Sequence, residues 1–101
     1  MSIKGKAVPE YRKETMERAR MFQNMGNPVR LCILQKLRHK NRMCVSEFCA
    51  CMDASQPLIS KHLKHLKDEG ILKSDTKGQF VWYELIDNSV LKVLDALDQS
   101  E

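Results

Sequence analysis

The hydrophobic pattern of this sequence changes period at Gly70, and that change constrains the fold more than any other feature. Before Gly70, apolar residues recur at the three-to-four-residue spacing of amphipathic helices. After it, a β-favouring run, Phe-Val-Trp-Tyr at 80–83, follows a Lys-Gly turn signal at 77–78. We therefore expect helices first and then a β-hairpin built from residues 71–76 and 79–86.

Local start and stop signals indicate five helical segments, four before the hairpin and one after it. Gly26 ends the first segment, and Asn27 followed by Pro28 begins the second, because asparagine caps helices and proline fits the first helical position. Ser46 and Ser55 are the predicted N-caps of the third and fourth segments. The expected helices span residues 9–25, 28–39, 46–52, 56–69 and 88–99.

The expected fold class is mainly α with one β-hairpin, in the winged helix-turn-helix order α-α-α-α-β-β-α. A chain of 101 residues supplies one hydrophobic core, so we expect a single domain over residues 1–101, with residues 1–8 as a flexible N-terminal arm. No apolar run approaches the roughly 18 residues that a membrane helix needs. We therefore expect a cytoplasmic protein without a membrane partner, whose cysteines stay reduced.

The charge of the chain favours an anionic partner, since 17 Lys and Arg against 13 Asp and Glu leave a formal net charge of +4. Two short helices joined by a tight turn, at 46–52 and 56–69, are typical of a helix-turn-helix, whose second helix enters the major groove of double-stranded DNA. The alternative interpretation of the lysines is a solvated helix face. The candidate DNA contacts are Ser55, Gln56, Ser60, Lys61, Lys64, Lys73 and Lys77.

Four runs of sequence carry a resemblance to a known family. GNPVRLCIL at 26–34, SQPLISKHLKHL at 55–66, GIL at 70–72 and VWYEL at 81–85 together resemble the ArsR/SmtB family of bacterial winged-helix repressors, over residues 21–97. The resemblance implies a homodimer, joined through its first and last helices, that binds palindromic operator DNA and is released by a metal, metalloid or thiol oxidant. Apolar stripes on the terminal helices agree with a dimer. The interface candidates are Met16, Phe22, Val90, Leu94 and Leu97.

Arsenic-responsive members of that family carry the segment E-L-C-V-C-D-L-C at the start of the third helix. Residues 42–49 here read R-M-C-V-S-E-F-C, which keeps Cys44 and Cys49 and has Ser46 in place of the middle thiol. Thiolates select soft ions over hard ones. The resemblance and this chemistry together predict an inducer such as As(III), Sb(III) or Cd(II), bound through Cys44 and Cys49, and no permanent cofactor.

A third ligand for such an ion has four candidate sources: Cys51, Cys32, the other subunit or solvent. Helical geometry places Cys49 and Cys51 on opposite sides of the third helix, because residues two apart differ by about 200° around the axis. Cys32 lies in a core-facing helix, and we interpret it as a packing residue. We also interpret His62 and His65 as structural, with His62 hydrogen-bonded at the core edge and His65 solvated or near phosphate.

Three other functions stay open at this point. The same thiols can form a disulfide or accept a persulfide, which would make the chain a redox or reactive-sulfur sensor on the same fold. If all four cysteines are packing residues, the chain is a DNA-binding module without a sensor. A small thiol redox enzyme using Cys49 and Cys51 is disfavoured, because no βαβ pattern and no base accompany them. We do not expect an enzyme.

Overall fold

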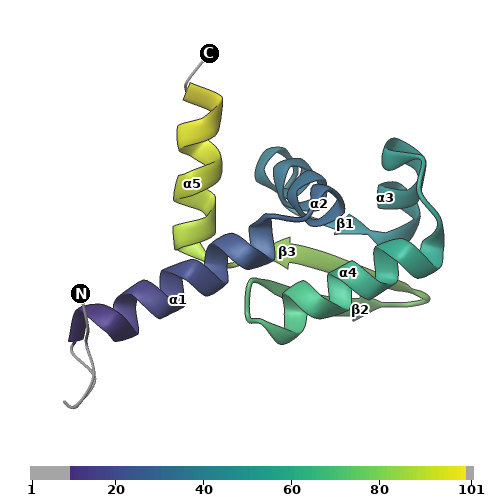
Figure 1. Ribbon diagram of the computed structural model, residues 1–101. Coiled ribbons are helices and arrows are strands. Elements are labelled where there is room, and N and C mark those ends of the chain that lie inside the picture. Colours follow the sequence, from purple (N-terminus) through teal and green to yellow (C-terminus); the bar gives the residue numbers. More distant parts are fainter. Residues whose placement is uncertain (1–9, 100–101) are drawn as a thin grey trace.

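The computed structural model describes residues 10–99, which form five helices and a three-stranded sheet (Figure 1). The predicted fold class is confirmed, since helices precede a β-hairpin in winged helix-turn-helix order and a helix follows it. The expected arm at residues 1–8 lies outside the described residues. The elements are α1 (Glu10–Met25), α2 (Pro28–His39), β1 (Met43–Cys44), α3 (Val45–Met52), α4 (Gln56–Asp68), β2 (Leu72–Lys77), β3 (Phe80–Leu85) and α5 (Asn88–Gln99).

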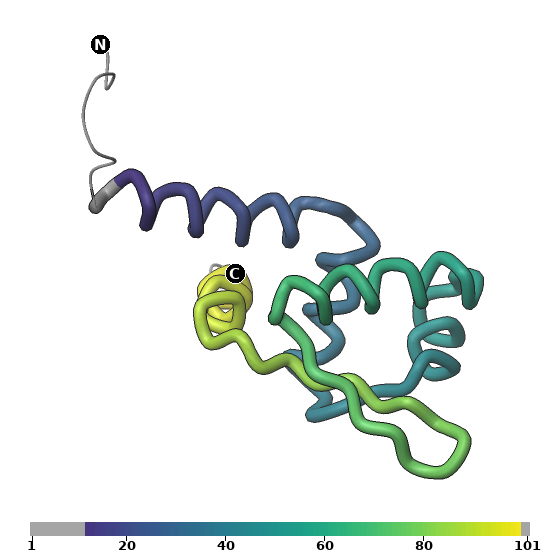
Figure 2. Tube along the Cα trace, turned by 90° about the horizontal axis from the view of Figure 1, so that it is seen from below, coloured from purple at the N-terminus to yellow at the C-terminus, as the bar shows by residue number. Residues whose placement is uncertain are grey.

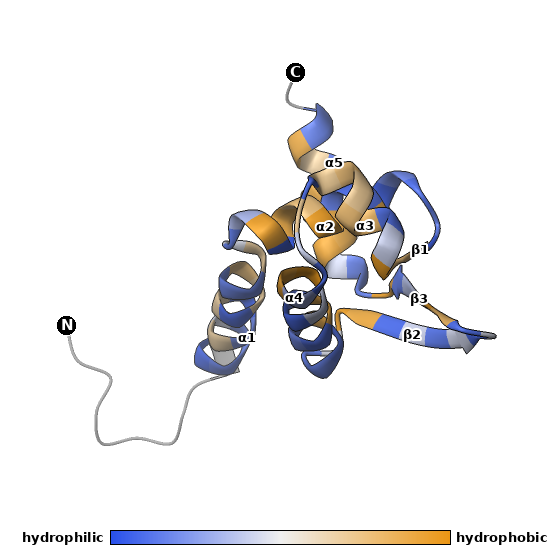
Figure 3. Cartoon of the chain, turned by 90° about the vertical axis from the view of Figure 1, so that its right-hand side faces the viewer, coloured by the Kyte–Doolittle hydropathy of each residue, from blue (hydrophilic) through white to orange (hydrophobic). Residues whose placement is uncertain are grey.

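Helices α2, α3 and α4 gather on the sheet and α5 packs against α2, whereas α1 extends away from this group. Figures 1 and 2 both show α1 running outward toward its N-terminal end. Hydrophobic residues are concentrated where α2, α3 and α4 meet, as Figure 3 shows. None of the described helices has the length and hydrophobicity needed to cross a membrane.

The sheet contains one more strand than the sequence predicts. Residues 40–43 read as a polar connection, but Met43 and Cys44 form β1, which pairs antiparallel with β3 through Met43↔Tyr83 and Cys44↔Trp82. The strand order is β1-β3-β2. This prediction was wrong because a two-residue strand has no period of its own and depends entirely on its distant partner.

The hairpin turn lies one residue later than predicted. Lys77 pairs with Phe80 at the end of the ladder, so the turn consists of Gly78 and Gln79 rather than residues 77–78. Gly78 has a φ of +63°, a conformation that glycine adopts without steric cost. Gln79 therefore stands at the tip of the wing, as we call the β2–β3 hairpin.

Three predicted helix boundaries are confirmed by their capping contacts. Asn27 Oδ1 accepts hydrogen bonds from the backbone N–H groups of Val29 (2.9 Å) and Arg30 (3.1 Å) at the start of α2. Ser55 Oγ accepts from the Leu58 N–H at 3.4 Å at the start of α4. Gly70, with a φ of +77°, follows the end of α4.

The predicted cap of the third helix was wrong. Helix α3 begins at Val45 with Cys44 as its N-cap, so Ser46 lies in the first turn instead of before it. Pairing with Trp82 keeps the Cys44 backbone extended, which places the change from strand to helix immediately after Cys44. Glu47 completes the start of the helix, because its carboxylate accepts a hydrogen bond from the Cys44 N–H at 3.2 Å.

Two residues that the sequence predicts at a dimer interface are buried in the hydrophobic core. Val90 and Leu94 of α5 are 0% and 1% exposed and belong to the hydrophobic core of the single chain, which also contains Phe48 and Leu63. That part of the interface prediction needs correction. The other three candidates, Met16, Phe22 and Leu97, are exposed.

Candidate DNA-binding surface and thiol pocket

A tight turn sets the angle between α3 and α4. Asp53 ends α3 in the left-handed region with a φ of 51°, and the Ala54 N–H donates to the Cys49 carbonyl at 3.3 Å. Ser55 then caps α4, so its hydroxyl serves the backbone of this helix. Because Ile59 and Leu63 are fully buried, the opposite face of α4 is turned outward.

The outward face of α4 carries the predicted DNA contacts. Gln56, Lys61 and Lys64 are exposed and Ser60 is half-buried. Lys64 Nζ lies 2.8 Å from the Asp68 carboxylate one turn away, which raises the pKa of the lysine through that hydrogen bond. Among residues 10–99, Lys61 has no carboxylate partner. Of these two predicted contacts, Lys61 is therefore unpaired and Lys64 is paired within the helix.

The two predicted wing lysines are exposed and each pairs with a carboxylate of the same hairpin. Lys73 Nζ lies 3.2 Å from Glu84, and Lys77 Nζ lies 3.5 Å from Asp75. Exposed pairs of this kind contribute about 0–1 kcal/mol, so both ammonium groups are available to exchange partners. The structure thus places cations on two neighbouring elements, the outer face of α4 and the wing.

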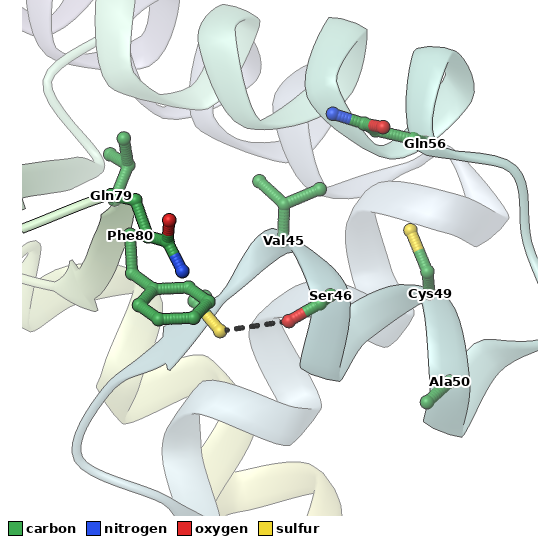
Figure 4. Close-up of a pocket in the computed structure, with 9 residues that line it drawn as sticks. Val45, Ser46, Cys49, Ala50, Gln56, Gln79 and Phe80 are labelled. Carbon is green, nitrogen blue, oxygen red and sulfur yellow. Dashed lines mark hydrogen bonds between the residues drawn. The ribbon is translucent and has the colours of Figure 1, made fainter.

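Cys44 and Cys49 line the same pocket, which has a volume of about 660 Å³ and lies between the start of α3 and the wing (Figure 4). The Ser46 hydroxyl lies 3.2 Å from the Cys44 sulfur, which is the dashed line in Figure 4. Cys49 lies on the other side of Ser46 from Phe80. The remaining wall is mostly apolar and includes Val45, Ala50, Phe80 and Val81.

The pocket also includes the polar residues Gln56, which is a predicted DNA contact, and Gln79. Gln56 is the first residue of α4, and Gln79 is at the wing tip. Sequence reasoning missed the presence of Gln79 and Phe80 beside the thiols. Their location follows from the pairing of β1 with β3, which the sequence pattern does not signal.

The other two cysteines line a separate pocket. Cys32 of α2 and Cys51 of α3 face a groove of about 490 Å³ between those helices. Cys51 is exposed and its sulfur lies 3.7 Å from the Phe48 carbonyl. As helical geometry predicts, Cys49 and Cys51 therefore face different pockets.

Within residues 10–99, no group of three or more His, Cys, Asp or Glu side chains is arranged to hold a metal ion. Cys51 thus does not complete a three-thiolate site with Cys44 and Cys49 in this conformation of one chain. Any third ligand to that pair has to come from elsewhere or through a local rearrangement.

The hydrogen bonding of His62 and His65 differs from the prediction. His62 is buried, but its Nδ1 has no hydrogen-bond partner in the described part of the chain, contrary to the expected hydrogen bond. Burial, with the nearby charges of Arg30 and Lys61, lowers the pKa of His62. His65 is not simply solvated, because its Nε2 lies 2.8 Å from Asn24 Oδ1 on α1. Both rings are therefore part of the packing around α4.

Comparison with known proteins identifies the family. Residues 27–74 match the family described as bacterial regulatory protein, arsR family. The uncharacterized HTH-type transcriptional regulator MJ1325 of Methanocaldococcus jannaschii is 35% identical over 81 residues, which cover 80% of this chain and 91% of that protein. This chain belongs to the ArsR family. It is accordingly a transcriptional repressor of the ArsR/SmtB type and not an enzyme, as the sequence predicts.

Other ArsR-family proteins align over different shares of their length. The arsenical resistance operon repressor of Escherichia coli is 35% identical over 65 residues, and this chain spans 56% of that relative. The solved structure of NolR from Sinorhizobium fredii superposes with a TM-score of 0.80 at 30% identity, covering 94% of each chain. The ArsR-type winged-helix fold therefore extends over nearly the whole chain.

Proposed function

We propose that this ArsR-family protein represses transcription in the cytoplasm as a homodimer on dyad-symmetric operator DNA. Helix α4 of each subunit lies in a major groove, and the wing lies against the neighbouring backbone or minor groove. Exposed Met16 and Phe22 on α1 support a dimer, being 60% and 56% exposed to solvent in the single chain. A dimer doubles the net charge of +4 that faces the DNA.

Side chains on the outer face of α4 have the chemistry for reading DNA. Gln56, at the N-terminus of the helix, suits a bidentate contact with adenine, and Ser60 can donate to or accept from a base edge. Lys61 and Lys64 pair with phosphates or guanine. On the wing, Lys73 and Lys77 leave their exposed carboxylate partners for phosphates.

The proposed inducer is a thiophilic ion, such as As(III), Sb(III) or Cd(II), that binds the thiolates of Cys44 and Cys49. A single observation carries this proposal: both thiols line the pocket that also contains Gln56 and Gln79. An ion that draws the two sulfurs together moves the start of α3 and the residues beside it. The name of the Escherichia coli relative, an arsenical resistance operon repressor, supports the same class of inducer.

Ser46 limits the number of sulfur ligands that this pocket offers to such an ion. Its hydroxyl, already in contact with the Cys44 sulfur, stands where the arsenic-responsive motif has a thiol. A hydroxyl is a much poorer ligand for a soft ion than a thiolate. The ion therefore takes two sulfur ligands from this pocket and a third from solvent or from the partner subunit.

The experiment is a fluorescence-anisotropy titration of the protein on its own promoter DNA with arsenite, antimonite and cadmium. The ions are expected to release wild-type protein, whereas Cys44→Ser and Cys49→Ser proteins remain bound. Cys32→Ser and Cys51→Ser are matched controls, since these cysteines line the other pocket. If both Cys44→Ser and Cys49→Ser are released at the wild-type ion concentration, the assignment of the site fails.

A second candidate inducer is an oxidant or a reactive sulfur species acting on the same thiols. The observation that favours it is the absence of a three-ligand cluster within residues 10–99, because a disulfide requires only two thiols. Peroxide and polysulfide arms of the same titration separate the two inducers. Release by polysulfide that dithiothreitol reverses, with no response to arsenite, antimonite or cadmium, favours the redox sensor.

A further inference from the structure

Four polar side chains join α1 to the end of α4, and we call them the α1–α4 bridge: Arg20 and Asn24 from α1, His65 from α4 and Glu69 at its C-cap. Arg20 donates to both oxygens of the Glu69 carboxylate, from Nε at 2.6 Å and from Nη2 at 2.7 Å. Asn24 Nδ2 donates to the same carboxylate at 3.0 Å. The Asn24 Oδ1 atom lies 2.8 Å from His65 Nε2, so Asn24 contacts two successive turns of α4.

The bridge fixes the orientation of α1 relative to α4 as well as joining the two helices. Asn24 is 7% exposed, and both polar atoms of its side-chain amide bond to α4 or its cap. Hydrogen bonds weaken steeply with angle, and leaving a buried amide unpaired costs free energy. An apolar contact would let α1 slide or rotate on α4, whereas this set of bonds is satisfied in one arrangement.

The same end of α1 is bonded to α2 as well. Arg30 donates from Nε to the Asn24 carbonyl at 2.8 Å and from Nη2 to the Gln23 carbonyl at 3.2 Å. These bonds hold the C-terminal end of α1 against both α2 and α4. The rest of α1 runs outward from that end, as Figure 2 shows, with Met16 and Phe22 exposed.

Helix α1 therefore acts as a lever whose angle is set at its C-terminal end. It has 16 residues, which corresponds to a length of about 24 Å at 1.5 Å per residue. A tilt of roughly 10° at the bridge moves the far end by about 4 Å, and one base pair of B-DNA rises about 3.4 Å. A small change in the angle of α1 at the bridge thus moves its far end by about the distance that one base pair adds to an operator.

We infer that Arg20 and Asn24, acting through Glu69 and His65, are positioning residues that set the separation of the two α4 helices in the dimer. They thereby select the spacing of operator half-sites that the protein accepts. The inference rests on the proposed binding of operator DNA by a homodimer through α1. It adds a specificity determinant that touches no base.

The test compares operator duplexes with the same half-sites and a centre shortened by one base pair, unchanged, or lengthened by one or two. Anisotropy on wild-type protein is expected to give a roughly tenfold preference for the natural spacing, comparable to the cost of one mismatched base pair. Arg20→Glu is expected to reduce the preference to about threefold or less. A duplex with a single half-site should bind both proteins equally.

A charge exchange makes the test specific to the bridge. The double variant Arg20→Glu/Glu69→Arg restores the ion pair between the helices but removes the carboxylate that accepts from Asn24, so it is expected to recover part of the spacing preference. Arg18→Glu is the matched control, because Arg18 lies on the same helix and pairs with Glu14 within it. Arg20 itself is 70% exposed at its side chain, so the substitution leaves the core untouched.

The outcomes separate this inference from the proposed function. A wild-type protein that binds operator without a spacing preference overturns the inference and leaves operator binding intact. Loss of preference in Arg18→Glu as large as in Arg20→Glu, or no recovery in the double variant, also overturns it. If wild type does not distinguish operator from scrambled DNA, both fail. Should circular dichroism show that Arg20→Glu is unfolded, Arg20→Gln replaces it, with an intermediate loss expected.

Discussion

Cys44 lies directly opposite Trp82 in the register of β1 and β3, so the single tryptophan of the chain is the cross-strand neighbour of a buried thiol. Residues opposite each other in an antiparallel pair have Cα atoms about 4.5–5.5 Å apart. Arg42 lies on the same indole, with its guanidinium carbon 5.2 Å from the ring centroid. The surroundings of Trp82 therefore report on the thiol pocket.

The first prediction uses this neighbour as a probe. Addition of arsenite or cadmium to the protein without DNA is expected to quench Trp82 emission in a saturable way, because an ion bound to Cys44 changes the surroundings of the indole. Steady-state fluorescence measures the effect. Cys44→Ser should lose the response, whereas Cys32→Ser should keep it, since Cys32 faces the other groove. Equal quenching in both variants would show that the ion binds elsewhere.

A second prediction distinguishes the two kinds of apolar residue on the terminal helices. Leu94→Ala is expected to lower the free energy of unfolding by about 2–5 kcal/mol, because it leaves a cavity in the core. Met16→Ala should change that free energy, measured on dilute protein, by no more than about 0.5 kcal/mol. Sedimentation is expected to show weaker dimerisation for Met16→Ala. A dimer unaffected by Met16→Ala and Phe22→Ala would exclude this surface of α1 from the interface.

Base contacts and phosphate contacts made by α4 are expected to affect DNA binding in different ways. Gln56→Ala is expected to cost about 1–3 kcal/mol of binding on the operator and to relax specificity at one base pair. Lys61→Ala should weaken binding to all sequences alike and reduce the slope of log K against log salt by about one. Titrations at several salt concentrations measure both. Lys92→Ala on α5 is the control, and a loss there equal to that of Lys61→Ala would indicate a general charge effect.

The Glu69 carboxylate makes the α1–α4 bridge sensitive to acid. Its hydrogen bonds, first with Arg20 and then with Asn24, lower the pKa of Glu69 from 4.5 to about 2. The unfolded chain therefore takes up a proton at Glu69 at a higher pH than the folded chain does. The stability from this group is complete above about pH 4.5 and is lost as the pH falls toward 2.

Urea unfolding at several pH values tests this dependence. Wild type is expected to be more stable than Glu69→Gln at pH 6, with the difference shrinking steadily as the pH falls from 4.5 toward 2. Glu14→Gln is the matched control, because Glu14 forms only an exposed pair within α1. A difference between wild type and Glu69→Gln that stays constant over this range would contradict the assigned pKa.

Local signals predicted most of the fold correctly. Asn27, Ser55 and Gly70 mark helix boundaries through contacts with residues only a few positions away, so the pattern alone identifies them. Strand β1 was missed because its formation depends on Tyr83, forty residues further along the chain. The same pairing makes Cys44, and not the predicted Ser46, the N-cap of α3.

The candidate site was predicted in part for the same reason. The outward face of α4 follows from its period, so Gln56, Lys61 and Lys64 were found on it. An apolar stripe, by contrast, does not say whether its own chain or a second subunit covers it, which is why Val90 was assigned to the interface. The bond between Asn24 and His65 joins residues 41 positions apart and has no signature in either helix.

Cys44 is at once the last residue of β1, the N-cap of α3 and the partner of Trp82. The first helix of the helix-turn-helix therefore begins immediately after a residue that is paired directly with the wing, with no linker between them to absorb a displacement. A new bond at this sulfur would act on α3 and on the wing in a single step. In a repressor with this arrangement, an inducer that binds Cys44 would act on these elements directly, without a structural change transmitted through the hydrophobic core.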